Sequence, residues 1–243
     1  MLELITFAII NGSSVVLGAI IGAFRELKQK TIAAFMAFGS GVLICALTFG
    51  LMEEAFGHGG FDAVIIGFLF GGLLFIAGDY LIHLFGGRNH KQHQLSRRQS
   101  DSNSLMIVLG SALDGIPESI ALGITLFSNR EIGLMLITAI FISNFPESIS
   151  SACGLKKEQF SRSKILSMWI SVGFSMALAT VLSFLFLHNL NPNTIGILEA
   201  LAAGAILAML ADSMMPEAYK EGGYAIGTLT ILGFLVAFIM SRL

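Results

Sequence analysis

The chain has 243 residues, of which 55% are hydrophobic and 12% are charged, and its formal net charge is −2. Soluble domains carry about 25% charged residues, so this chain has too little charge to cover a globular surface in water. The absence of a basic region argues against nucleic-acid binding, and the two cysteines, which both lie in apolar stretches, predict no disulfide framework.

Apolar segments of about 20 residues, the length that spans a bilayer, follow one another along the chain. The sequence therefore predicts an all-α, polytopic membrane protein with a single transmembrane domain over residues 1–243. Residues 87–103 form the only long polar run and are predicted to be a flexible loop. We expect eight membrane-spanning helices, at residues 2–24, 31–56, 62–86, 104–127, 132–155, 165–187, 195–216 and 223–241.

Basic residues predict the orientation of these helices. Of the 14 Lys and Arg residues, all except Arg130 and Arg242 lie in the connections that follow spans 1, 3, 5 and 7. The positive-inside rule places these connections in the cytoplasm. Both termini are then expected outside the cell and the 87–103 loop inside it.

Spans 2 and 7 resemble each other. The segment GSGVLICALTFGLMEEAF, from Gly39, aligns without gaps with AAGAILAMLADSMMPEAY, from Ala202. Span 2 runs outward and span 7 inward, and similar sequences in opposite directions are typical of the inverted repeats of transporters. We expect spans 1–3 and 6–8 to form such a repeat around spans 4 and 5. The alternative is chance similarity between two apolar helices.

Spans 4 and 5 share a second pattern, SALDGIPESIALGI and FISNFPESISSACG, in which Pro-Glu-Ser-Ile recurs. Carboxylates inside a membrane are costly and rare. Asp114 and Glu118 are four residues apart and so share one helix face. Ser143 and Glu147 have the same spacing in span 5, and Asn144 lies beside them.

Each proline in these motifs also frees a backbone oxygen, because it cannot donate to the carbonyl four residues earlier. The freed carbonyls belong to Leu113 and Ile142. Carboxylate, carbonyl, amide and hydroxyl oxygens at one level suit a partly dehydrated cation. A divalent metal would neutralise the clustered negative charge, and the lack of Lys or Arg within the spans argues against anionic substrates. The alternative is that these polar groups only hydrogen-bond helices together.

At these residues the chain resembles the ZIP (Zrt/Irt-like) family of divalent-metal transporters. The family has eight spans, both termini outside, a variable cytoplasmic loop after span 3, and a His-Asn-x-Pro-Glu-Gly signature in span 4. Here DGIPES and SNFPES occupy the motif positions of spans 4 and 5, and MPEAY resembles a stretch at the end of span 7. The resemblance implies metal ligands at Asp114, Glu118, Ser143, Asn144 and Glu147.

The chain departs from the family pattern at the signature histidine, which is Asp114 here, and at its Asn, which is Gly115. Imidazole suits zinc, whereas carboxylate and carbonyl oxygens suit manganese and other hard cations. The missing histidine thus leads to the hypothesis that Mn²⁺ or Fe²⁺ is favoured over zinc.

Several further polar residues are candidates for a metal pathway, with solvated helix ends or membrane-interface positions as the alternative. They are Glu54, Asp79, His83, Asp212 and Glu217.

The function expected from these observations is secondary transport of divalent metal into the cytoplasm by alternating access, in the plasma membrane. No Walker-type phosphate loop occurs, and no enzyme activity or cofactor is expected, only the lipid bilayer and the transported metal as partners. Gly-rich faces permit a homodimer. The alternatives are a relative that has lost transport and acts as a metal-binding or regulatory protein, a membrane enzyme, and an ion-coupled transporter of organic solutes.

Overall fold

The computed structural model describes residues 2–84, 101–187 and 189–242, without the side chains of His83 and residues 101–106. These residues form helices and short connections, and no strand occurs among them, which confirms the all-α prediction. The elements are α1 Leu2–Phe24, α2 Gln29–Ala46, η1 Leu47–Leu51, α3 Met52–Leu84, α4 Asp101–Ser128, α5 Arg130–Lys157, α6 Arg162–Leu187, α7 Pro192–Met209, η3 Leu210–Met214, α8 Met215–Gly222 and α9 Ala225–Met240.

Six helical segments in the described part of the chain are long and apolar enough to cross a membrane, which confirms a polytopic membrane protein. One of them, Gln29–Ile82, has 54 residues and contains a break. At Gly60, φ is 66° and ψ is −164°, a region that is essentially restricted to glycine. The apolar helix α9 has 16 residues. The predicted 87–103 loop falls mostly outside the described residues, and α4 begins at Asp101.

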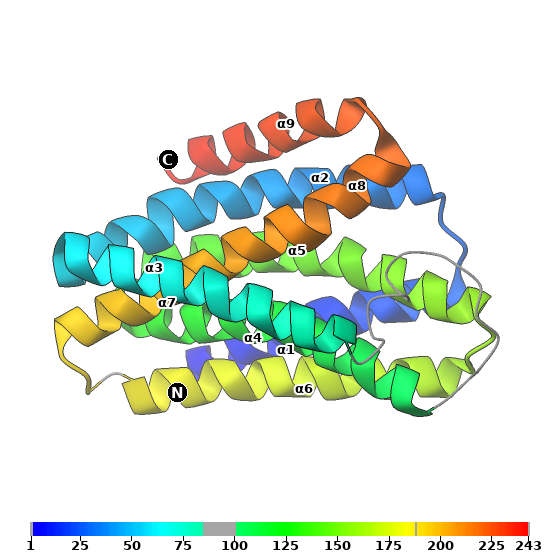
Figure 1. The fold of residues 1–243 in the computed structure, drawn as a ribbon, viewed down its shortest axis with the longest axis horizontal. Helices are drawn as coiled ribbons and strands as arrows, with labels where there is room; N and C mark the ends of the chain where they lie inside the picture. Colours follow the sequence, from blue (N-terminus) through cyan, green and yellow to red (C-terminus); the bar gives the residue numbers. More distant parts are fainter. Residues whose placement is uncertain (1, 85–100, 188, 243) are drawn as a thin grey trace.

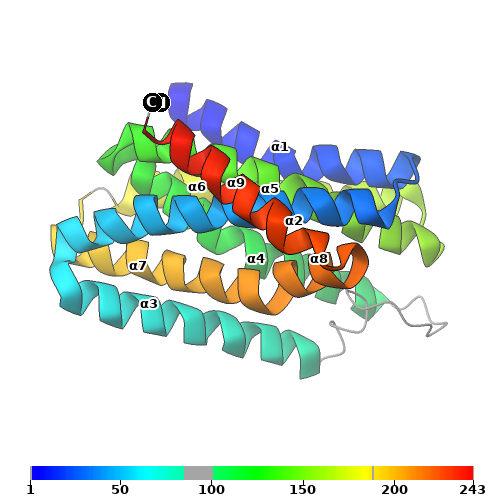
Figure 2. The same cartoon turned by 90° about the horizontal axis from the view of Figure 1, so that it is seen from above.

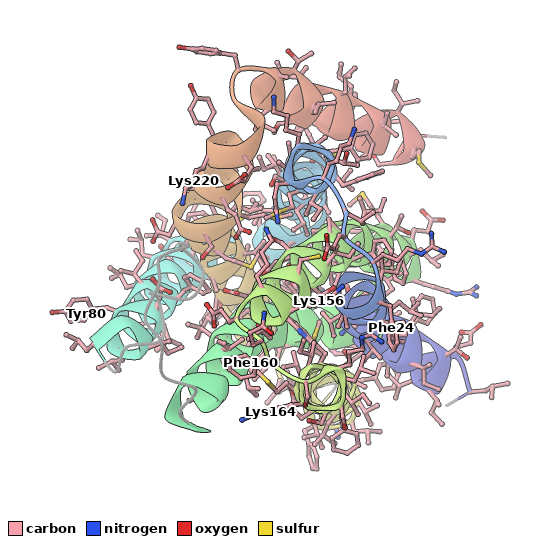
Figure 3. All side chains as sticks on the ribbon, turned by 90° about the vertical axis from the view of Figure 1, so that its right-hand side faces the viewer. Phe24, Tyr80, Lys156, Phe160, Lys164 and Lys220 are labelled. Atoms are coloured by element: carbon pink, nitrogen blue, oxygen red, sulfur yellow. The ribbon has the colours of Figure 1, made fainter. Side chains whose placement is uncertain are left out.

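The long helices lie side by side, with both chain termini at one end of the bundle (Figures 1 and 2). In the interior, α5 packs against α1 and α2, whereas α4 packs against α6 and α7. The opposite end of the bundle, which faces the viewer in Figure 3, carries Lys156, Lys164 and Lys220. Lysines at two of the connections predicted to be basic, α5–α6 and α8–α9, therefore share one end.

Close helix contacts depend on glycine at several crossings. A Cβ at Gly12 in α1 would meet the carbonyl of Gly173 in α6, and one at Gly173 would meet the carbonyl of Gly12. Gly41 in α2 faces the carbonyl of Thr230 in α9, and Gly204 in α7 faces that of Phe68 in α3. Small residues let helix backbones approach where lipid offers no hydrophobic driving force.

The backbone follows the same course after α2 and after α7. Both helices have 18 residues, and each is followed by a π-helix of 5 residues, η1 or η3. A short helical stretch comes next, and it ends in each case at a glycine with φ of 66°, Gly60 or Gly223. The offset that aligns Gly39 with Ala202 also aligns the starts of α2 and α7, the two π-helices, and Gly60 with Gly223. In Figure 1, α2 and α7 run in opposite directions.

Candidate metal site

The Pro-Glu motifs lie in the interiors of α4 and α5, which continue as helices through Pro117 and Pro146. The two helices contact each other near the centre of the bundle. Since neither proline has an N–H, the carbonyls of Leu113 and Ile142 lack their usual helical donors. Each helix therefore brings backbone oxygen to the level of its glutamate.

Glu118 is the most deeply placed carboxylate of the predicted set. Its side chain is fully buried, and its Oε2 accepts a hydrogen bond of 2.7 Å from Asn144 Nδ2 across the α4–α5 contact. Its Oε1 has no hydrogen-bond partner among the described residues. A buried polar oxygen without a partner is costly, so this atom is available for a ligand.

A small cavity opens beside this pair. Ser111, Asp114, Asn144, Glu147 and Ser148 contribute to its polar lining, and its volume of about 10 Å³ is close to the least that holds one water molecule. Asp114 is buried and Glu147 half-buried. Both carboxylates lie near enough to Glu118 to interact with it electrostatically. Oxygen atoms from α4 and α5 thus line part of a space about the size of one water molecule. Side chains of α1 and α6 close its other sides, and Glu118 lies beside this space without lining it.

Ser143, the remaining predicted ligand, is placed differently. It is fully buried, its Oγ donates to the carbonyl of Ile140 at 3.1 Å, and its backbone lies against Gly39 of α2. It does not line the cavity of Asp114 and Glu147. The structure therefore brings four of the five predicted ligands together and sets Ser143 to one side.

The candidate pathway residues are spread over the bundle. Glu54 accepts a hydrogen bond from Asn129 Nδ2 at 2.9 Å, and Glu217 accepts one from Ser150 Oγ at 2.6 Å, which ties α8 to α5. Asp212 is exposed on η3, and Asp79 is half-buried on α3. His83 belongs to α3, but its side chain lies outside the described residues.

The most compact group of side chains that could hold a metal ion joins Glu54, a candidate pathway residue, to two residues that were not among the predicted site residues. Glu54, His58 and Glu199 each offer one ligand atom, and these atoms lie within 4.8 Å of one another. No other group of three His, Cys, Asp or Glu within the described residues is as close, the α4–α5 carboxylates included. Glu199 lies within an apolar span, where carboxylates are rare, and that rarity is the sequence signal that could have identified it.

Comparison with known proteins points to one family. The family model described as ZIP Zinc transporter matches residues 87–241. Zinc transporter ZupT of Salmonella heidelberg is 26% identical over 90% of this chain and 87% of its own length, and Zinc transporter ZupT of Shigella flexneri is 25% identical over 86% and 84%. An Arabidopsis thaliana protein, named provisionally as a zinc transporter, is 23% identical, and the match covers 88% of this chain but only 34% of that protein.

Proposed function

Because the chain belongs to the ZIP zinc transporter family, we propose that it is a secondary transporter that moves divalent metal ions across a membrane, into the cytoplasm. Transport in this proposal uses a carboxylate site between α4 and α5 and involves no enzymatic reaction. The relatives named as zinc transporters support this class of substrate. The plasma membrane is the proposed location.

The observation that carries the proposal is the environment of Glu118. A fully buried carboxylate with one unpaired oxygen lies beside the carboxylates of Asp114 and Glu147. No described Lys or Arg forms an ion pair with Glu118 to neutralise this charge. Buried carboxylates persist when they are paired or coordinate a metal. We assign Asp114, Glu118, Asn144 and Glu147 as the ligands, and Ser143 as a weaker ligand that would have to turn from its own helix.

The proposed mechanism is alternating access by two inverted halves of three spans each, placed around the α4–α5 pair. The break at Gly60 supports counting the long 29–82 segment as two spans, which with α9 makes eight. The equal lengths of α2 and α7, the matching π-helices and the paired glycines Gly60 and Gly223 support an inverted repeat of spans 1–3 and 6–8. These halves would move about the α4–α5 pair and expose its site to each side in turn.

The orientation and the pathway complete the proposal. Lys156, Lys164 and Lys220 at one end of the bundle (Figure 3) would face the cytoplasm, which leaves both termini outside. Glu54 would lie toward the outer end of the pathway, with Asp79, His83, Asp212 and Glu217 toward the cytoplasmic end. A homodimer is compatible with this arrangement.

The metal itself is proposed to be zinc, the ion in the names of the relatives. The donor atoms of the α4–α5 site are all oxygens, which favour Mn²⁺ and Fe²⁺ more than an imidazole site would. Measuring the uptake of Zn²⁺, Mn²⁺ and Fe²⁺ at equal low concentrations shows whether the protein prefers zinc or one of the other two metals.

Uptake into liposomes tests the proposed function. The purified protein is reconstituted, and uptake of Zn²⁺, Mn²⁺ and Fe²⁺ is measured for the wild type and for Glu118→Gln/Glu147→Gln. We expect saturable uptake that the double substitution abolishes. Glu26→Gln, a substitution of an exposed carboxylate, is the matched control and should transport normally.

A folded, inserted wild type that transports none of these metals would overturn the proposal. It would favour the alternative in which the chain keeps the fold and acts as a metal-binding or regulatory protein. If that protein still bound metal, metal binding without transport would be the activity to assign to it.

A further inference from the structure

A second group of ligands lies away from the α4–α5 site, at the end of the bundle that holds the chain termini. Glu54 and His58 come from the first turns of α3, and Glu199 comes from α7. His58 Nδ1 and Glu199 Oε2 are 2.9 Å apart, and the three ligand atoms lie within 4.8 Å of one another. An imidazole and two carboxylates therefore converge on one point.

The hydrogen-bond partners of the two carboxylates outside the group itself are neutral. Glu199 is fully buried, and its Oε1 accepts a hydrogen bond of 3.4 Å from Ser128 Oγ. Glu54 Oε1 accepts from Asn129 Nδ2 at 2.9 Å. Within the described residues no Lys or Arg forms an ion pair with either carboxylate. Two carboxylates in this setting carry negative charge that a bound cation would neutralise.

The spacing of the group suits a transition metal. Zinc binds nitrogen and oxygen ligands at about 2.0–2.2 Å in a tetrahedral arrangement, so that neighbouring ligand atoms lie roughly 3.4 Å apart. His58 Nδ1 and Glu199 Oε2 would need to separate by only a few tenths of an ångström to admit the ion. Ser128 and Asn129 hold the carboxylates by hydrogen bonds, as outer-shell residues orient ligands in metal sites.

The backbone holds the two helices in this register. A Cβ at Gly196 of α7 would lie 2.7 Å from the carbonyl oxygen of Ala55 and 2.9 Å from the nitrogen of Gly59. The start of α3 and the start of α7 are therefore in direct backbone contact, one turn from His58 and Glu199. The ligands are positioned by helix packing and not by a loose loop.

We propose that Glu54, His58 and Glu199 form a second divalent-metal site, distinct from the α4–α5 site, with imidazole–carboxylate ligands that select zinc or another transition metal over Mg²⁺ and Ca²⁺. His58 has 27% of its side chain exposed, so an ion can reach the group from the adjacent solution. This proposal concerns binding alone and does not depend on transport by the α4–α5 site.

X-ray absorption and equilibrium binding of Zn²⁺ to the full-length protein in detergent micelles test the proposal. The measurement uses Glu118→Gln/Glu147→Gln as the background, because these substitutions remove the proposed α4–α5 ligands. We expect one zinc ion to remain bound, with the multiple scattering of an imidazole in its spectrum. Adding His58→Gln should remove the imidazole signal and lower the affinity at least 10-fold, because the loss of even an outer-shell residue costs about 10–100-fold in metal affinity.

Two further variants keep the result interpretable. Glu199→Gln retains the size of the buried side chain and should weaken zinc binding as His58→Gln does, whereas Glu53→Gln changes an exposed neighbour and should have no effect. Each variant is first shown to be monodisperse and helical. Absence of zinc binding in the Glu118→Gln/Glu147→Gln background, or binding that survives both His58→Gln and Glu199→Gln, would overturn the proposal. Loss of uptake with this site intact would count only against the transport function.

Discussion

At the scale of single residues, the hydrogen bond between Asn144 and Glu118 is the central contact of the proposed α4–α5 site. It joins the two helices through one oxygen of the carboxylate and leaves the other oxygen open. Ser143 is adjacent in sequence but donates to its own helix. Two neighbouring polar residues in one motif therefore have different roles, which their sequence positions do not distinguish.

Substitution of Asn144 should separate these roles. We expect Asn144→Ala to raise the apparent KM for metal uptake by about 10-fold or more. Asn144 is a proposed ligand that also holds Glu118, and even residues that only orient metal ligands contribute on this order. Ser143→Ala should change it much less, since the Ser143 hydroxyl is engaged with the Ile140 carbonyl. Initial rates of uptake in liposomes measure both values. Equal effects of the two substitutions would contradict this assignment.

At the scale of elements, glycine decides where helices end and how closely they pack. Gly60 and Gly223 have positive φ, and a Cβ at either position would meet no atom within 4 Å. Glycine is therefore required at these two positions by the backbone conformation and not by lack of space for a side chain. At Gly41 and Gly204 the requirement is different, because the carbonyl of a neighbouring helix occupies the space of a side chain.

A matched pair of substitutions tests the conformational requirement. Gly223→Ala should destabilise the protein by about 1–3 kcal/mol, the cost of placing a non-glycine residue in this region of φ and ψ. Gly227→Ala, in α9 and also without neighbours within 4 Å, should be neutral or stabilising, because alanine is the better helix former. Thermal unfolding in detergent, followed by circular dichroism, measures the difference. Similar melting temperatures for the two variants would show that the bend at Gly223 is not required.

At the scale of the whole molecule, the helix contacts can be compared with the proposed inverted repeat of spans 1–3 and 6–8. The contacts of α2 with α9 and of α7 with α3 each use a glycine, and Gly41 and Gly204 are equivalent in the proposed repeat. Gly12 and Gly173 meet where α1 crosses α6. Paired contacts of this kind are expected of an inverted-repeat transporter, in which a central site is open to one side of the membrane and then to the other.

The orientation of the molecule is open to a direct test. In a variant that lacks the two buried native cysteines, single cysteines are introduced by Glu3→Cys and Lys220→Cys. Both side chains are exposed, at opposite ends of the bundle. A membrane-impermeant maleimide should label Glu3→Cys in intact cells and Lys220→Cys only after permeabilisation. The reverse labelling pattern would show that the proposed orientation is inverted. Equal labelling of both cysteines in intact cells would contradict the proposal that Glu3 and Lys220 lie on opposite sides of the membrane.

The amino-acid sequence by itself determined the all-α membrane class, because twenty-residue apolar runs can satisfy their backbone in lipid only as helices. It also identified the Pro-Glu motifs, since prolines and carboxylates are conspicuous in such runs. Only the tertiary structure decided that Asn144 reaches Glu118, that Ser143 does not line the cavity, and that Glu199 joins Glu54 and His58. These contacts join residues on different helices, and their geometry follows from how closely glycine lets those helices approach, which a pattern along one helix does not contain.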